Sequence, residues 1–195
     1  MSTSSTKKDK ILAKLELNAS YKIKDIGEAK LILRMHINRK KETGNITLSQ
    51  YAYSEWILEH FHITKWKSAS TPLLPEIMLN DDDSPSSPKK TKEMEDISYY
   101  KALGLLIWLQ DTTHPDLFFS INLLSCFTHD PDKAHWNTLK LVLCYMKGIL
   151  DYKITYHANR KLDLYGYINS DFSGDKNIQR SIEGNMFFVA GRPVS

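Results

Sequence analysis

The chain has 195 residues, of which 42% are hydrophobic and 25% are charged, and its formal net charge is +3 at pH 7. This length can form one good core, or one core plus part of a second, and the mild positive charge permits contact with nucleic acid without requiring it. No stretch has the length of a membrane span and residues 1–10 carry no apolar run, so we expect an intracellular protein, cytoplasmic or nuclear, with no membrane partner.

The first 79 residues predict a leader, a hairpin and two helices. Residues 1–8 are polar and are expected to be disordered, whereas residues 9–18 are expected to form a short helix. Two strands over residues 31–38 and 45–50 flank a polar turn and should pair as a β-hairpin. Residues 51–61 then predict an aromatic-rich helix, whose inward-facing side chains are Tyr53, Trp56, Ile57 and Phe61.

A polar segment at residues 80–95 separates this part from a helical part. It contains NDDDSPSSPKKTK, which has almost no apolar residue, two prolines and a switch in the sign of its charge, and it predicts a mobile linker. Helices are then expected over residues 97–110, 115–127 and 131–148. The last of them should have Asp130 as its N-cap and a buried stripe made of Trp136, Leu139, Leu143 and Met146.

Strands at residues 154–156, 162–170 and 185–189 complete the pattern. We therefore expect an α+β fold, in which a β-hairpin and a helical bundle precede a smaller sheet. The expected division is a leader (1–8), a hairpin and helix (9–79), a flexible linker (80–95), a helical part (96–150) and a part made of strands (151–195).

Short motifs run through the chain in order. They are DIGEAK at residues 25–30, ITLSQY at 46–51, STPL at 70–73, YYKALG at 99–104, HPD at 114–116, NLLSCF at 122–127, HW at 135–136, YMKG at 145–148 and GYINSDFSGD at 166–175. They resemble DLGE.K, I.LSQ.Y, STP(L/M), YR..(V/I)G, RPD, NLLSRF, HW, YLKG and GYSDADWAGD in the Pol polyprotein of copia-type (Ty1/copia) LTR retrotransposons. The resemblance covers roughly residues 11–195. It implies the palm end and helical thumb of a reverse transcriptase, followed by a truncated RNase H-like sheet.

Reverse transcription needs two divalent ions held by carboxylates. In the family these carboxylates lie on a YVDD-like hairpin before the DLGE segment, whereas only a short polar leader without an Asp-Asp pair precedes Asp25. The carboxylate run at residues 81–83 lies in the expected linker, which offers no rigid scaffold for a metal. Since no HxxxH or CxxC pair occurs either, we expect no metal and no cofactor; Mg²⁺ would belong only to the intact family enzyme.

The RNase H motif is altered at its first metal ligand. Aligning the glycine flanks of GYINSDFSGD puts Asn169 at the position of the family's first catalytic aspartate. A neutral amide cannot replace a carboxylate that bridges two cations. Asp171 matches the second aspartate of the motif and is a weak substitute candidate, through a register slip. The chain also ends before the family's later carboxylates, so we expect no catalytic residue.

Nucleic-acid contact is the second possibility that the sequence raises. Arg34 replaces a family glycine in the primer-grip strand and is either a phosphate contact or a solvent-facing side chain. On the last helix the family's basic residues become Asn137, Leu141 and Cys144, which share one face. A narrower lysine stripe at seven-residue spacing survives, as a residual duplex contact or as a solvated face. The candidate nucleic-acid-binding residues are Lys133, Lys140, Lys147 and Arg34.

Three functions remain open at this point. The preferred one is a non-catalytic remnant of a retrotransposon reverse transcriptase/RNase H polyprotein, a pseudoenzyme. The alternatives are a weak nucleic-acid-binding module that uses the thumb lysines on an RNA or DNA duplex, and a thumb fragment that completes a reverse transcriptase in trans. The sequence indicates no small-molecule partner and does not give the oligomeric state. Cys126 and Cys144 are expected to be reduced thiols.

Overall fold

The computed structural model describes residues 7–24, 27–74, 77, 79, 94, 97–171 and 182–194. Helices and antiparallel sheets are both present, so the α+β class is confirmed. The chain divides into two compact units, Met1–Lys30 and Leu31–Ser195. The first contains helix α1 (Lys7–Ser20), which includes the helix expected at residues 9–18. Of the leader expected at residues 1–8, residues 1–6 lie outside the described residues, as does the linker at residues 80–95 except for Met94. Lys7 and Lys8, which were expected to be disordered, instead belong to α1.

The expected hairpin is present, with one difference at its start. Strands β2 (Met35–Arg39) and β3 (Ile46–Ser49) pair antiparallel, with Ile37 opposite Leu48. The predicted first strand, residues 31–38, is instead two strands, because the chain reverses between β1 (Leu31–Ile32) and β2. Leu33 and Arg34 have φ angles of 48° and 65°. Positive φ at both central residues is what a tight two-residue hairpin turn requires.

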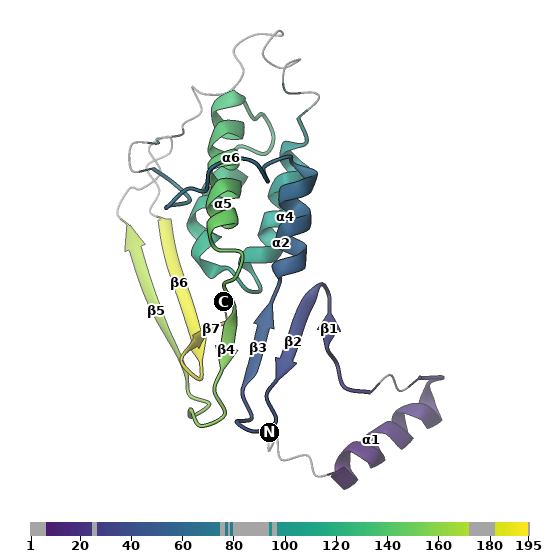
Figure 1. The fold of residues 1–195 in the computed structure, drawn as a ribbon. Coiled ribbons are helices and arrows are strands. Elements are labelled where there is room, and N and C mark those ends of the chain that lie inside the picture. Colours follow the sequence, from purple (N-terminus) through teal and green to yellow (C-terminus); the bar gives the residue numbers. More distant parts are fainter. Residues whose placement is uncertain are drawn as a thin grey trace. The chain divides into compact units, whose positions relative to one another are not determined.

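The strand after the last helix belongs to the hairpin sheet. Residues 151–195 were expected to form one group of strands, and this prediction is wrong for β4 (Ile154–Tyr156). β4 pairs antiparallel with β3 and completes a sheet in the order β1-β2-β3-β4 (Figure 1). The hydroxyls of Thr47 and Thr155 lie 3.0 Å apart across this pair. The free edge of β3 thus pairs with a strand more than a hundred residues later, which local periodicity does not reveal.

A second sheet follows, in the order β5-β6-β7. Its long strands, β5 (Leu164–Asp171) and β6 (Ile182–Val189), match the strands expected at residues 162–170 and 185–189, whereas β7 (Arg192–Pro193) was not predicted. β7 lies beside β4, because Arg192 Nε donates to the Thr155 carbonyl at 2.9 Å. The two sheets are therefore joined at this point (Figure 1).

Four helices pack together to form the core: α2 (Tyr51–His60), α4 (Tyr99–Gln110), α5 (Phe118–Ser125) and α6 (Lys133–Gly148). A short 3-10 turn, Pro115–Leu117, precedes α5. The predicted stripe of α6 is confirmed at Leu139, Leu143 and Met146, which are fully buried, while Trp136 is partly buried against the core. Tyr53 and Ile57 are buried as predicted, whereas Trp56 remains 38% exposed and was placed inside wrongly.

The start of α6 differs from the prediction. Its N-cap is Asp132, not Asp130, because the pair Asp132 and His135 forms a capping box. Asp132 accepts from the Lys133 amide at 2.5 Å, and the Asp132 amide donates to His135 Nδ1 at 3.0 Å. The His135 ring also stacks on Phe127 at 4.2 Å between centroids. Histidine replaces the usual Glu or Gln of this motif.

Several residues of the family motifs connect helices to one another. Gln50 of ITLSQY is buried, and its Oε1 accepts from the Thr113 hydroxyl at 2.6 Å and from the Thr112 hydroxyl. Asp116 of HPD accepts from the Tyr145 hydroxyl of YMKG at 2.8 Å. Tyr99 of YYKALG donates to the Leu124 carbonyl, also at 2.8 Å. These motif positions therefore have clear structural roles in the arrangement of the bundle.

His114, in the HPD motif, should make stability depend on pH. Burial lowers its pKa below the ordinary 6.5, and the nearby Asp116 opposes this effect. Because the unfolded chain binds the proton more readily, stability is fully present above about pH 6.5 and falls below it, by about 1.4 kcal/mol per pH unit until the folded pKa is reached. Urea unfolding of a His114→Gln variant between pH 7.5 and 5 should lack this component. The exposed His129→Gln is the control, and equal pH slopes for the parent and His114→Gln would contradict the assignment.

Candidate nucleic-acid interface

The three lysines of α6 have different surroundings. Lys147 Nζ donates to the carbonyls of Thr64 and Trp66, at 2.7 and 2.6 Å. It thereby fixes the loop after α2 against the end of α6, and its charge is shared with carbonyl oxygens. Lys140 Nζ lies over two rings, 5.5 Å from the centroid of Trp66 and 5.9 Å from that of Trp136. Lys133 is exposed in the first turn of the helix.

The face of α6 that lost the family's basic residues is partly covered. Asn137 is exposed and Leu141 is half-buried, but Cys144 is only 7% exposed and belongs to the core. The loop after α2 covers it, since the Ala69 amide donates to the Cys144 carbonyl at 3.2 Å. Burial raises the pKa of the Cys144 thiol, while Lys147 and Lys140 oppose this effect. Residue 144 therefore does not share the exposure of Asn137, although the two lie on the same face of the helix by spacing.

Arg34 is brought to the helices by the turn between β1 and β2. Its guanidinium carbon lies 5.4 Å from the ring centroid of Tyr53 and 5.1 Å from that of Trp56. Such cation–π contacts are worth about 0.5–1 kcal/mol at an exposed position. A left-handed residue other than glycine costs about 1–2 kcal/mol. The two effects are of similar size, so the arginine is tolerated where the family has glycine.

Aromatic side chains connect Arg34 to Lys140. On α2 the Tyr53, Trp56 and His60 rings are stacked in sequence, with centroids 6.1 and 5.4 Å apart. Phe61 then contacts His60 edge-on at 5.0 Å and Trp136 at 6.1 Å. We call this set, with its two cations, the aromatic strip: Arg34, Tyr53, Trp56, His60, Phe61, Trp136, Lys140 and Trp66. From the sequence, Tyr53, Trp56 and Phe61 were expected to face inward and Trp136 to lie in the buried stripe of the last helix. The link between these rings and residue 66 was not predicted.

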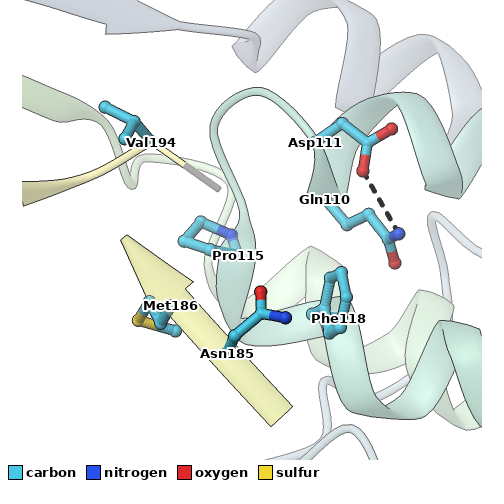
Figure 2. A pocket seen from close by; sticks show the side chains of 7 residues that line it. All are labelled: Gln110, Asp111, Pro115, Phe118, Asn185, Met186 and Val194. Atoms are coloured by element: carbon cyan, nitrogen blue, oxygen red, sulfur yellow. Dashed lines mark hydrogen bonds between the residues drawn. The ribbon is translucent and has the colours of Figure 1, made fainter. Parts of the chain in front are cut away.

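A small pocket lies between the end of α4, the 3-10 turn and β6 (Figure 2). Its volume is about 120 Å³. Gln110 Nε2 donates to Asp111 Oδ1 at 3.3 Å on one side, and apolar side chains form most of the rest. The pocket is lined by Gln110, Asp111, Pro115, Phe118, Asn185, Met186 and Val194. Among the described residues that line it, Asp111 carries the one charge, which is negative, so the pocket does not suit a phosphate.

Asn169 and Asp171 lie near the end of β5. In the ladder with β6, Asn169 is opposite Gly184 and Asp171 is opposite Ile182. No group of three or more His, Cys, Asp or Glu that could hold a metal ion occurs among the described residues, to which residues 81–83 do not belong.

Cys126 is exposed, Cys144 is buried and both are free thiols. In the part of the chain that the structure describes, no helix is long and apolar enough to span a membrane.

Comparison with known proteins relates this sequence to transposon Pol polyproteins. The chain is 32% identical over 191 residues to the retrovirus-related Pol polyprotein from transposon TNT 1-94 of Nicotiana tabacum, matching 96% of this chain and 14% of the polyprotein. It is 29% identical over 180 residues to an uncharacterised mitochondrial protein of Arabidopsis thaliana, or 92% of this chain and 71% of that protein.

A third relative is the putative transposon Ty5-1 protein of Saccharomyces cerevisiae, 27% identical over 183 residues, which are 93% of this chain and 57% of that protein. No protein-family model and no solved structure matches the chain. The chain belongs to the Pol polyproteins of copia-type retrotransposons, as the motifs predicted. It spans a small part of the tobacco polyprotein, so the activities of a whole Pol protein do not transfer to it directly.

Proposed function

We propose that this chain is a non-catalytic, nucleic-acid-binding part of a copia-type Pol polyprotein. In this proposal α4, α5 and α6 correspond to the thumb, and β5 and β6 correspond to the opening strands of an RNase H-like domain. Asn169 then occupies the position of the first metal ligand, where a neutral amide does not hold a divalent cation.

One observation carries the binding half of this proposal. Arg34 and Lys140, which are far apart in the sequence, lie at opposite ends of one aromatic strip on the helical bundle. Cations attract phosphate groups, and aromatic rings stack with bases, so the combination suits nucleic acid. Lys133 adds an exposed positive charge at the start of α6, whereas Lys147 supports the loop at residues 64–66.

A paired assay of binding and catalysis tests this function. The purified chain should bind labelled oligonucleotides at low salt, yet incorporate no nucleotide on a primed template and cleave no RNA–DNA hybrid with Mg²⁺ or Mn²⁺. The reason is that phosphoryl transfer needs counter-ions for the developing charge. Template-dependent incorporation or hybrid cleavage by this chain alone, in proportion to its concentration, would disprove the catalytic half. An absence of oligonucleotide binding at low salt would disprove the proposed nucleic-acid binding.

The same assay addresses the second candidate, in which the chain supplies a thumb in trans. The matched segment is 14% of the tobacco polyprotein, so that polyprotein contains further segments outside the match. Under this candidate, incorporation appears only when a separate palm fragment is added. Incorporation that needs both fragments would therefore favour the candidate in trans over the simple binding function.

A further inference from the structure

We infer that the aromatic strip binds single-stranded nucleic acid by stacking with unpaired bases, in preference to a duplex. This inference rests on the proposed nucleic-acid binding and specifies its ligand. The strip lies entirely on described residues of one compact unit, and it combines the two elements of single-strand recognition, which are stacking rings and cations that attract the backbone.

Packing alone does not explain the whole strip. Tyr53 is buried, and Phe61 and Trp136 are partly buried against the core, so burial of apolar surface accounts for these three rings. Trp56 and Trp66 are different, since they are 38% and 47% exposed and do not belong to the core. Each of them lies within 5.5 Å of a cation. Two accessible tryptophans with adjacent cations form a surface on which bases can stack.

The charge around the strip favours a polyanion at the Trp66 end. Lys65 and Lys67, next to Trp66 in the sequence, are both exposed, and Lys140 lies over the ring itself. At the other end Arg34 presents an exposed guanidinium above Trp56. Glu59 opposes this attraction. It follows Trp56 by three residues on α2 and is exposed, so it lies beside the strip.

The preference for a single strand over a duplex follows from the side chains on the surface of α6. A protein helix that binds along a duplex needs a row of cations that contact successive phosphates. The paired bases are stacked inside the duplex and expose only their edges to the protein. On α6 that row is interrupted by exposed Asn137, half-buried Leu141 and buried Cys144, and Lys147 is engaged with two carbonyls. The exposed tryptophan rings of the strip find no free base face to stack on in an intact duplex. Unpaired bases do offer their faces, so the strip matches them better.

Binding of a labelled oligothymidylate and of a hairpin duplex of equal length, measured by fluorescence anisotropy at low salt, tests the inference. The single strand should bind more tightly and should quench tryptophan fluorescence. Trp56→Ala and Trp66→Ala should each weaken single-strand binding, by about five- to 150-fold according to the usual cost of losing one base–ring stack. Trp56→Phe should retain most of the affinity because it keeps a ring. Glu59→Gln should strengthen binding.

Tyr100→Ala is the matched control, because Tyr100 is an exposed ring on α4 outside the strip. It should bind like the parent, and unchanged thermal unfolding by circular dichroism would show that each variant is folded. Equal or tighter binding of the duplex, or undiminished binding by both folded tryptophan variants, would overturn the inference. If Lys140→Gln weakens binding in that case, the proposed function survives as purely electrostatic binding. If neither oligonucleotide binds, the proposed function itself fails.

Discussion

A Cys144→Arg substitution should lower the free energy of unfolding by about 3–5 kcal/mol, the usual effect of a buried charge without a partner. The family has a basic residue here, so a comparison of motifs alone would predict a harmless or useful change. The structure predicts the opposite, because the loop after α2 covers this position and Cys144 is packed in the core. Lys140 and Lys147, both positive, lie one turn away on the same helix and would repel the new cation.

Asn137→Lys is the matched control for this prediction. It restores another basic residue of the family on the same helix, but at an exposed position, so its effect should stay within about 0.5 kcal/mol. Urea unfolding followed by circular dichroism measures both variants. If Cys144→Arg were as stable as Asn137→Lys, the loop at residues 66–70 would not cover α6 in solution.

Two glycine-to-alanine changes should have effects of opposite sign. Gly44 lies in the turn between β2 and β3 with φ of 71°, and an added Cβ would be 2.9 Å from the Cβ of Ala158. A left-handed alanine costs about 1–2 kcal/mol, and relief of the clash requires the backbone of one turn to move. The total loss for Gly44→Ala should therefore be about 2–4 kcal/mol.

Gly104→Ala should instead raise stability by about 0.5–1 kcal/mol. Gly104 is an exposed position within α4, and a Cβ added there would meet nothing within 4 Å. Alanine lowers the conformational entropy of the unfolded chain and is a better helix former. Thermal and urea unfolding of the two variants provides the comparison. A stabilised Gly44→Ala would mean that the hairpin turn does not pack against residue 158, and a strongly destabilised Gly104→Ala would point to a contact that the fold does not show.

Much of the fold could be predicted because it is local. The helices α2, α4 and α6 follow from apolar residues at helical spacing, and β2 with β3 follow from alternation around a polar turn. The buried stripe at Leu139, Leu143 and Met146 was predicted in the same way. These features depend on residues within a few positions of one another, so one sequence is sufficient to predict them.

The features that the sequence did not predict depend on distant contacts. The pairing of β4 with β3 and the covering of Cys144 both join segments far apart in the chain. The turn at Leu33 and Arg34 has none of the glycine or asparagine that usually marks it. The aromatic strip was missed for the same reason, since its rings come from α2, α6 and the loop between α2 and α4.

The residues that carry the family resemblance divide into two groups. Gln50, Tyr99, Asp116, Tyr145 and Lys147 make hydrogen bonds between elements, so their presence is explained by the fold itself. Asn169 and Arg34 depart from the family pattern. Membership in the Pol family and the proposed lack of catalysis are therefore compatible, because this chain keeps the motif residues that organise the bundle and has Asn169 at the proposed metal position.

The salt dependence of binding to a single-stranded oligonucleotide tests the central claim most directly. If Arg34 and Lys140 contact two phosphates, the logarithm of the binding constant should fall with the logarithm of the salt concentration with a slope of about −1.4, at about −0.7 for each neutralised phosphate of a single strand. The Arg34→Gln and Lys140→Gln variants should each reduce the steepness by about half. A slope near zero, an unchanged slope in both variants, or no binding at the lowest salt concentration would contradict the claim that this strip is a nucleic-acid interface.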